Sequence, residues 1–401
     1  MKRFICVQTG ARRNYAVPKI LSQNSLLEAF YNDLNASSGL GEAIKTICPS
    51  SLRKGAISRL LSREVPPDVV KKTCTFDLPS IKYLFRQKLA GGNVTKAHYW
   101  LQRFDEDFSQ AMIRKGLGQA THVFSMFGEG SQFIEYAKNK GLTTVVEEYL
   151  SPLTHKIIQE EREKYPEIEP PLPQEIIDSD YAWFKKLCKS VDVFLAPSSF
   201  VVQGLEAFGV SSSQCRIVPY AASDKWFKVE NRPVKGRVLF VGTAELRKGI
   251  HTLGMAAQKL APYSYEFRVA GNASITVRDH PLLKHFMFLG RVPRTEIHKE
   301  FEKADVFVLP SLAEGSAEVT YEALATGLPV ITTKASGSVV RHGIDGFIVP
   351  ESDANALADA IKEILENRPL RDQMAAVAKH HAQDYTWDKY AERLLTVFQS
   401  I

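Results

Sequence analysis

Two glutamates, Glu314 and Glu322, stand eight positions apart in the stretch SLAEGSAEVTYEALATGLPVI, residues 311–331. A carboxylate ahead of a helix can accept hydrogen bonds from ligand hydroxyls, and a second one inside the helix can accept the paired hydroxyls of a ribose. The Gly-Ser turn between them would expose backbone N–H groups at the positive end of the helix dipole, which suits a phosphate. The pattern therefore predicts a site for a sugar and a nucleotide.

The helix in this stretch has recognisable ends. Ser316 is a suitable N-cap, Gly327 is suited to end the helix, and the proline two positions later prevents its continuation. These limits place Glu322 two turns inside the helix. The alternative is that both acids of the pair are ordinary surface residues, and we assign that role to Glu318, a first-turn acid favoured by the helix dipole.

Apolar runs with strand character alternate with helical patterns along the rest of the chain. In the first half the runs are FICVQ (4–8), HVFSMF (122–127), TTVVEEY (143–149) and VDVFLAPS (191–198). In the second half they are RVLFVG (237–242), YEFRVAG (265–271), MFLGRV (287–292), DVFVLPS (305–311), LPVITT (328–333) and GFIVP (346–350). The alternation predicts an α/β fold with two doubly wound, Rossmann-like domains that face a cleft at the carboxyl ends of their strands. The order of elements over residues 36–94 is left open.

The length of 401 residues fits two domains. We expect an N-terminal domain over residues 1–215 and a C-terminal domain over 216–384. The polar, turn-rich stretch 220–236 is the expected linker. The amphipathic stretch at residues 385–401 can pack on either domain, including back on the N-terminal one.

Composition excludes several classes of protein. The formal charge is +6, but basic and acidic residues are interspersed, so a nucleic-acid partner is not expected. The five cysteines form no metal-binding or disulfide pattern, which indicates reduced thiols, a cytoplasmic protein and no metal site. A basic face on the N-terminal half leaves open a peripheral contact with the inner face of a membrane. Its residues are Arg12, Arg13, Lys19, Arg53, Lys54, Lys71 and Lys72.

The segment from Glu314 to Glu322 resembles the E-x7-E motif of retaining GT-B glycosyltransferases of family 4, glycosyltransferase group 1. Lower similarity extends over residues 190–397, through VDVFLAPSSF, RIVPYAASDKWF, LFVGTAELRKGI, FLGRV and HGIDGFIVPESDANALADAI. The resemblance implies transfer of a sugar from a nucleotide-sugar donor with retained anomeric configuration, without a metal or another cofactor. It also implies that the N-terminal domain binds the acceptor and that the C-terminal domain binds the donor.

The resemblance assigns roles to residues of the C-terminal half. Glu314 would hold the hydroxyls of the donor sugar and Glu322 the donor ribose. The backbone groups of Gly315, Ser316 and Ala317 would meet the sugar or the diphosphate. The residues expected at the donor follow two strands. They are Glu314, Glu322, Gly315, Ser316 and Ala317 after the strand 305–311, and Gly242, Thr243, Arg247 and Lys248 at the end of the strand 237–242 and after it.

The phosphate-binding segment LFVGTAELRKGI departs from the family pattern. The family usually has an arginine directly after the glycine, where this chain has Thr243 after Gly242. Lys248 occupies the usual lysine position, and Arg247 is the candidate substitute for the arginine. A cation here would stabilise the charge that builds on the departing diphosphate. The alternative, a solvated start of a helix, places two cations against the helix dipole.

Four further positions are carried over from the family. Arg291 and Val292 match a segment whose backbone contacts the nucleobase, with an ordinary strand end as the alternative. Gly10, in QTGARRNYAVPK, stands where the family has a glycine-rich loop near the donor phosphates. His155 is the candidate for a histidine close to the donor sugar. Beside Gly10, the side chains of Arg12, Arg13 and Tyr15 are candidates for contact with an acceptor or phosphate, or are plain loop residues.

Other functions of the same fold remain open at this point. A nucleotide-sugar epimerase or hydrolase would turn over its donor without an acceptor. A non-catalytic sugar-nucleotide-binding relative is the third alternative, suggested by Thr243. The sequence does not indicate whether the donor is a UDP-, GDP-, ADP- or dTDP-sugar, or whether the acceptor is a glycan, a lipid-linked molecule or a small molecule.

Overall fold

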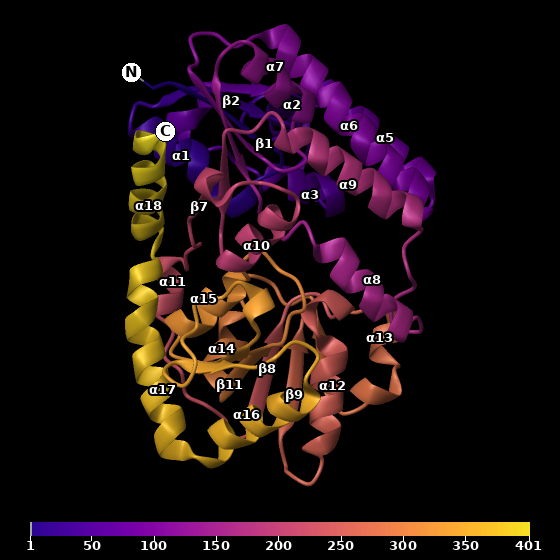
Figure 1. Cartoon of the computed structure of the whole chain (residues 1–401), viewed down its shortest axis with the longest axis vertical. Helices are drawn as coiled ribbons and strands as arrows, with labels where there is room; N and C mark the ends of the chain where they lie inside the picture. The colour runs from indigo at the N-terminus through magenta and orange to yellow at the C-terminus, as the bar shows by residue number, and fades with distance from the viewer. Residues whose placement is uncertain (1) are drawn as a thin grey trace. The chain divides into compact units, whose positions relative to one another are not determined.

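The computed structural model describes residues 2–401 and divides the chain into two compact units. The N-terminal unit comprises Met1–Glu148, Pro173–Leu195 and Ile401, and the C-terminal unit comprises Tyr149–Leu172 and Ala196–Ser400. Both contain a parallel sheet with helices against it, which confirms the predicted α/β class (Figure 1).

The N-terminal unit is built on a parallel sheet in which the strands follow the order β3-β2-β1-β4-β5-β6. The strands are β1 (Phe4–Gln8), β2 (Leu27–Asn32), β3 (Thr73–Thr75), β4 (His122–Met126), β5 (Thr143–Glu147) and β6 (Val193–Ala196). The helices are α1 (Ala16–Gln23), α2 (Gly39–Ile47), α3 (Gly55–Leu61), α4 (Pro67–Val70), α5 (Asp77–Ala90), α6 (Val94–Lys115), α7 (Ser131–Asn139) and α9 (Gln174–Cys188). Strands β1 and β4 are buried along their whole length, as expected for a sheet covered on both faces.

The C-terminal unit is built on a six-stranded parallel sheet of order β10-β9-β8-β11-β12-β13. The strands of the unit are β7 (Cys215–Ile217), β8 (Arg237–Val241), β9 (Glu266–Ala270), β10 (Phe286–Gly290), β11 (Val306–Leu309), β12 (Val330–Thr332) and β13 (Gly346–Ile348). The helices are α8 (Thr154–Lys164), α10 (Ser199–Ala207), α11 (Asp224–Phe227), α12 (Ile250–Lys259), α13 (Ile275–Arg278), α14 (His298–Lys303), α15 (Glu318–Ala325), α16 (Ala354–Glu366), α17 (Arg368–His381) and α18 (Trp387–Ser400).

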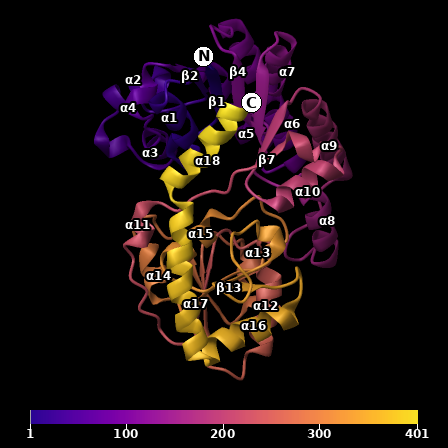
Figure 2. The same cartoon turned by 60° about the vertical axis from the view of Figure 1, so that its left-hand side comes forward.

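Helices cover both faces of this second sheet. Helix α12 packs with α16, and α15 packs with α17, which runs along the outside of the unit in Figure 2. The central strand β11 is completely buried, and the loop that follows it carries Glu314. Because strand order reverses between β8 and β11, the loops after these two strands meet at the position where open α/β sheets bind ligands.

All the apolar runs that predicted strands form strands, whereas the strands β2, β3 and β7 were missed. Strand β2 carries Glu28 and ends in the buried Asn32, and β3 has three half-buried residues without an apolar run. Helix α6 begins at Val94, where the Asn93 side chain accepts a hydrogen bond from the Lys96 backbone. The glycines that follow α7 and α10, Gly141 and Gly209, have positive φ, which suits the end of a helix.

The division between the units differs from the expected division at residues 215/216. The chain crosses between the units at 148/149, 172/173, 195/196 and 400/401, so residues 149–172, with α8, belong to the C-terminal unit. The stretch 220–236 is not a linker, because it is packed within that unit: Trp226 is buried, and its ring contacts the ring of Phe301. Polar and turn-forming residues there reflect a tightly folded surface segment.

Cys6, Cys48, Cys74, Cys188 and Cys215 are all free thiols. Across residues 2–401, no helix combines the length and the apolar character that crossing a membrane would require.

Candidate functional site

The carboxylate of Glu314 is held by two cations at the carboxyl edge of the second sheet. Its Oε1 lies 2.5 Å from Nζ of Lys248 and 2.7 Å from a guanidinium nitrogen of Arg247. Both cations come from the turn Leu246–Lys248, which follows β8, whereas Glu314 follows β11. Arg247 also contacts the Glu245 carboxylate at 2.6 Å and donates to the Ala313 carbonyl. The structure therefore brings together three residues that the sequence predicted for one site.

Backbone packing fixes this arrangement at two glycines. A Cβ on Gly249, which has a φ of +70°, would lie 1.9 Å from the carbonyl oxygen of Pro310. A Cβ on Gly315 would lie 1.8 Å from the carbonyl oxygen of Tyr149. Both positions therefore require glycine, since a side chain would force the two loops apart. The turn with Lys248 and the loop with Glu314 are held against neighbouring backbone in this way.

The two cations set the ionisation of Glu314. Burial alone would raise the pKa of its carboxyl, but the positive charges of Lys248 and Arg247 outweigh burial and hold the pKa below its ordinary value. Glu314 is therefore a carboxylate at neutral pH. A buried carboxylate with two cations within hydrogen-bond distance can exchange one partner for ligand hydroxyls or release a cation to a ligand phosphate.

Helix α15 begins later than predicted, and this changes the position of Glu322. The helix covers Glu318–Ala325 and its N-cap is Ala317, so Glu322 lies one turn inside it and not two. The predicted N-cap Ser316 is wrong, because its hydroxyl donates to the Gly337 carbonyl at 2.7 Å and contacts the Tyr321 hydroxyl. The serine side chain therefore bonds to the loop that follows β12 and does not cap the helix.

Glu322 has an environment opposite to that of Glu314. Burial raises the pKa of its carboxyl to about 7, and the charge of Glu318 adds to this effect. The pKa is lowered by the charges of Lys225 and Arg294 and by a hydrogen bond from the Trp226 indole, but these effects are smaller than that of burial. The carboxyl of Glu322 is thus a group that loses its proton easily when a ligand supplies hydrogen-bond donors.

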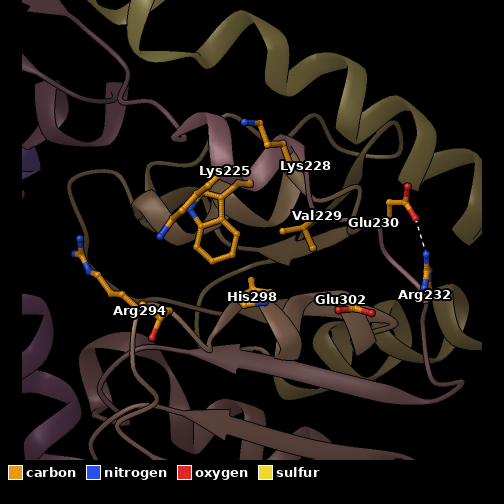
Figure 3. Close-up of a pocket in the computed structure, with 10 residues that line it drawn as sticks. Lys225, Lys228, Val229, Glu230, Arg232, Arg294, His298 and Glu302 are labelled. Atoms are coloured by element: carbon orange, nitrogen blue, oxygen red, sulfur yellow. Dashed lines mark hydrogen bonds and ion pairs between the residues drawn. The ribbon is translucent and has the colours of Figure 1, made fainter.

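A cavity of about 550 Å³ lies next to these residues. The cavity is lined by the three residues that lower the pKa of Glu322: Lys225 and Trp226 on α11, and Arg294 in the loop before α14 (Figure 3). Its other lining residues are Lys228, Val229, Glu230, Arg232, Thr295, His298 and Glu302. The sequence reasoning missed this cavity, because residues 225–232 fell in the expected linker.

The remaining predicted donor residues lie in the loops that follow β8 and β11. Gly242 has a φ of +142° and lies beside the side chain of Lys248. A Cβ on Gly242 would lie 3.0 Å from the lysine Cδ. Thr243 is exposed. The N–H of Ala317 donates to the Ser336 carbonyl at 3.1 Å, so a contact of this group with a diphosphate would require that bond to exchange.

Arg291 and Val292 follow β10, and His155 lies on α8. Arg291 is exposed and Val292 is half-buried directly after β10. His155 is half-buried in the first turn of α8, within the C-terminal unit and not in the N-terminal domain to which the sequence assigned it. Ile158 of the same helix packs against Leu312 and Ala313, next to Glu314.

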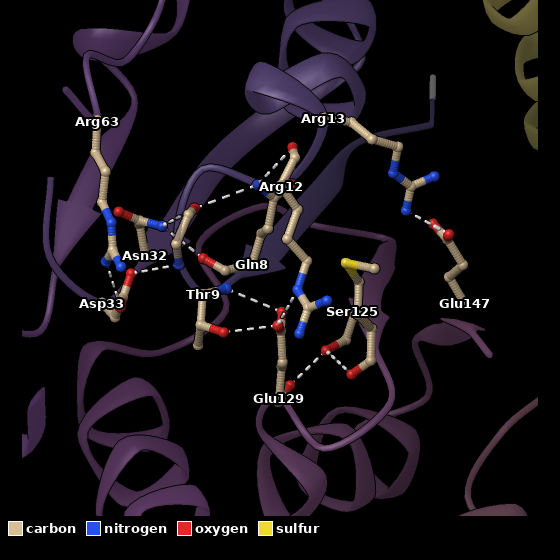
Figure 4. Close-up of polar contacts among 12 residues, drawn as sticks. Gln8, Thr9, Arg12, Arg13, Asn32, Asp33, Arg63, Ser125, Glu129 and Glu147 are labelled. Atoms are coloured by element: carbon tan, nitrogen blue, oxygen red, sulfur yellow. Dashed lines mark hydrogen bonds and ion pairs between the residues drawn. The ribbon is translucent and has the colours of Figure 1, made fainter. Parts of the chain in front are cut away.

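The N-terminal unit contains a second cluster of charged residues, shown in Figure 4. The buried Glu129 accepts hydrogen bonds from the Thr9 N–H at 2.9 Å and from the Thr9 hydroxyl at 2.6 Å. The Arg12 guanidinium lies 3.1 Å from the same carboxylate. Burial raises the pKa of Glu129 to about 7 in spite of Arg12 and the Thr9 donors. Gly10, predicted near donor phosphates, donates its N–H to Asp33 at 2.7 Å.

The loop after β1 has an unusual backbone. Arg13, Asn14 and Tyr15 all have φ between 48° and 60°, the left-handed region that side chains disfavour. Arg13 pairs with Glu147, and both side chains are almost completely buried. Tyr15 is also buried and donates to the Arg63 carbonyl, so it packs inside the unit and does not face a ligand as the sequence allowed.

Within residues 2–401, no group of three or more His, Cys, Asp or Glu side chains is arranged to hold a metal ion.

Solved structures resemble the chain over its whole length. Sucrose-phosphate synthase from Thermosynechococcus elongatus matches with a TM-score of 0.69 at 17% identity, covering 100% of this chain and 99% of the other. Anabaena HepE in complex with UDP matches with a TM-score of 0.63 at 14% identity, covering 100% of both chains. At this identity the likeness shows the fold alone, which is the GT-B fold of glycosyltransferases.

The sequence of the C-terminal unit is similar to that of known glycosyltransferases. Residues 222–381 match the family model of glycosyl transferases group 1. D-inositol 3-phosphate glycosyltransferase of Corynebacterium urealyticum is 29% identical over 42% of this chain and 44% of its own. Phosphatidyl-myo-inositol mannosyltransferase of Mycobacterium leprae is 32% identical over 30% of this chain and 33% of its own. In both cases the match spans less than half of the relative.

Proposed function

We propose that this protein is a glycosyltransferase that moves a sugar from a nucleotide-sugar donor bound by the C-terminal unit. The observation that carries the proposal is the carboxylate of Glu314, held by Lys248 and Arg247 at the switch point of the second sheet. The match of residues 222–381 to the family model of glycosyl transferases group 1 supports the reaction class. The proposal assigns donor binding to this unit and acceptor binding to the N-terminal unit.

The proposed donor site divides the work among four side chains. Lys248 and Arg247 turn from Glu314 to the diphosphate and stabilise the negative charge that develops as the bond to the sugar breaks. The freed Glu314 then accepts hydrogen bonds from hydroxyls of the sugar. Glu322, whose pKa is about 7, becomes a carboxylate when the two hydroxyls of a ribose donate to it.

The proposed transfer retains the anomeric configuration. The acceptor oxygen bonds to the anomeric carbon on the face from which the nucleoside diphosphate departs. The bond from that carbon to the phosphate oxygen breaks with its electron pair, and the departing phosphate takes the acceptor proton. This route requires no protein nucleophile and no metal, and the cations of the Lys248–Arg247 turn supply the charge stabilisation.

UDP-sugars are the first donors to test, because structural neighbours have been solved with UDP and with UDP-glucose. A glycan or lipid-linked acceptor is proposed on the names of relatives such as the phosphatidyl-myo-inositol mannosyltransferase. A cytoplasmic location and a contact with the inner membrane face stay predictions.

The proposal is tested by incubating the protein with UDP-, GDP-, ADP- and dTDP-sugars and following the anomeric proton by nuclear magnetic resonance, with glycan and lipid-linked acceptors and with water alone. We expect one nucleotide class to be consumed, and the product to keep the configuration of the donor. Addition of EDTA should leave the rate unchanged.

Glu314→Gln is the informative variant, with Glu363→Gln, at an exposed acid of α16, as the control. We expect the first to lose turnover and the second to keep it. Consumption of donor at equal rates with and without acceptor would instead indicate a hydrolase or an epimerase. If no donor class is consumed under any of these conditions, the proposed activity is wrong.

A further inference from the structure

Helix α5 exposes large apolar side chains along one side. Leu78, Ile81, Phe85 and Leu89 are spaced three and four positions apart and therefore lie on one stripe of the helix. With Leu84, they are between 42% and 65% exposed. A soluble surface normally carries such residues singly, so a contiguous stripe marks a surface with a partner.

The stripe continues onto the start of the next helix. Figure 1 shows α5 and α6 side by side at the outer edge of the N-terminal unit, and the two helices pack against each other. The turn between them and the first residues of α6 are exposed, including Val94 and Tyr99, each 52% exposed. We call α5 together with residues 91–99 the α5–α6 hairpin.

Apart from Asp77, the first residue of α5, the charged side chains of the α5–α6 hairpin are basic. Residues 78–104 contain no aspartate or glutamate, but they contain Lys82, Arg86, Lys88, Lys96 and Arg103. Lys82, Lys88 and Lys96 are exposed and border the apolar stripe. A helix with apolar residues on one side and lysines at its borders is the pattern of segments that lie in the interface of an anionic membrane.

Neighbouring acids are already engaged in the structure. Asp77 accepts a hydrogen bond from the Leu40 N–H at 2.9 Å, and Asp107 pairs with Arg86 at 2.9 Å. A second copy of the chain docked on the same face would place lysines against lysines without a carboxylate in residues 78–104 to pair with them. The charge therefore favours an anionic partner, and the apolar stripe favours one with a hydrocarbon interior.

We propose that the α5–α6 hairpin binds the surface of anionic phospholipid bilayers, with its leucines and Phe85 in the interface and Lys82, Lys88 and Lys96 at the lipid phosphates. The long lysine side chains place their charges at headgroup level while their methylenes cover apolar surface. This surface differs from the basic face expected from the sequence, none of whose residues lies in the hairpin. The inference is independent of the proposed sugar transfer.

The test measures flotation of the purified protein with vesicles of phosphatidylcholine alone and of phosphatidylcholine mixed with phosphatidylglycerol. We expect binding to the mixed vesicles, weakened by salt, and little binding to the neutral ones. The triple variant Leu84→Ser, Phe85→Ser and Leu89→Ser should bind at least about tenfold more weakly. Each lysine changed to glutamine at positions 82, 88 and 96 should lower binding about fivefold and reduce its dependence on salt.

Matched controls come from the C-terminal unit. Ile217→Ser, Ile275→Ser and Ile344→Ser remove exposed apolar side chains elsewhere, and Lys235→Gln, Lys259→Gln and Lys284→Gln remove exposed lysines. Both control sets should bind vesicles as the unchanged protein does. Thermal unfolding followed by circular dichroism checks that the hairpin variants remain folded.

Three outcomes overturn the inference. The unchanged protein fails to float with the mixed vesicles, or the folded hairpin variants float as well as it does. In the third, light scattering shows a dimer that the serine variant abolishes, which identifies the hairpin as an interface between copies of this chain. Donor binding is not used in any arm, so failure of the proposed enzyme activity leaves this test unaffected.

Discussion

The two units place an acid and a cation at the same point of the same topology. Strands β1 and β4 hold the central positions in the first sheet that β8 and β11 hold in the second. In each case the loop after the first of these strands supplies the cation, and the loop after the second supplies the acid. Glu129 with Arg12 thus corresponds to Glu314 with Lys248 and Arg247.

The two acids nevertheless have opposite ionisation. The pKa of Glu314 lies below its ordinary value because two cations outweigh burial, whereas burial raises the pKa of Glu129 to about 7. Arg12 is the cation beside Glu129 at 3.1 Å, and its side chain is 40% exposed. The second cation is what makes the site of the C-terminal unit suited to a diphosphate, which carries more than one charge.

The largest expected effect comes from removing that second cation. Lys248→Ala should lower kcat by about 10²–10³-fold, since the lysine stabilises charge that develops in the transition state. Arg12→Ala, the matched change in the N-terminal unit, should lower kcat by less than about tenfold. Rates with saturating donor measure both. Equal losses in the two variants would show that the units do not divide the work as proposed.

Stability as a function of pH should separate the two acids. A carboxyl with a raised pKa stabilises the folded state fully below its ordinary pKa of 4.5, and this contribution is lost as the pH rises to about 7. Glu129→Gln should therefore reduce the fall in unfolding free energy between pH 4.5 and 8 by about 3 kcal/mol.

Glu314 should show the opposite sign. Its pKa is lowered, so its stabilisation is present at neutral pH and is lost as the pH falls below 4.5 toward the folded pKa. Glu314→Gln should destabilise the protein at pH 7. Urea unfolding at a series of pH values measures both variants, and pH profiles parallel to that of the unchanged protein would contradict the assigned pKa shifts.

A smaller effect tests whether Arg247 replaces the arginine that the family usually has after the glycine. Arg247→Ala should weaken donor binding about tenfold, the value of one charge-assisted hydrogen bond. Thr243 is exposed, so an arginine can be introduced at this position. The double variant Arg247→Ala with Thr243→Arg should therefore recover most of the lost donor binding. Calorimetry measures the recovery. A double variant as weak as Arg247→Ala alone would contradict the idea that Arg247 replaces the arginine that the family usually has after the glycine.

The difference between the two clusters also explains what the sequence could predict. Glu314, Glu322 and Lys248 belong to contiguous segments whose strand, turn and helix appear in order, and the fold follows from the same alternation. Glu129 pairs with Thr9 across 120 positions, which no local pattern indicates. Its position between two glycines directly after the predicted strand 122–127 was the available signal.

The surroundings of Glu322 were hidden for a different reason. Trp226 belongs to a polar, turn-rich stretch, and only tertiary packing against Phe301 shows that it is part of the unit. The length of α15 was also misjudged, because Ser316 has the side chain of an N-cap but bonds to Gly337 across the site. Local propensity identifies a serine that can cap and does not identify a competing partner from another loop.

The most direct test of the account is calorimetric titration of UDP-, GDP-, ADP- and dTDP-sugars into the unchanged protein, Glu322→Ala and the control Glu363→Ala, which changes an exposed acid of α16. The account predicts that one nucleotide class binds, that Glu322→Ala weakens it by about 2 kcal/mol, or about 30-fold, and that the control leaves it unchanged. Absence of binding by all four classes, or equal affinity in Glu322→Ala, would contradict the claim that the C-terminal unit is the donor site.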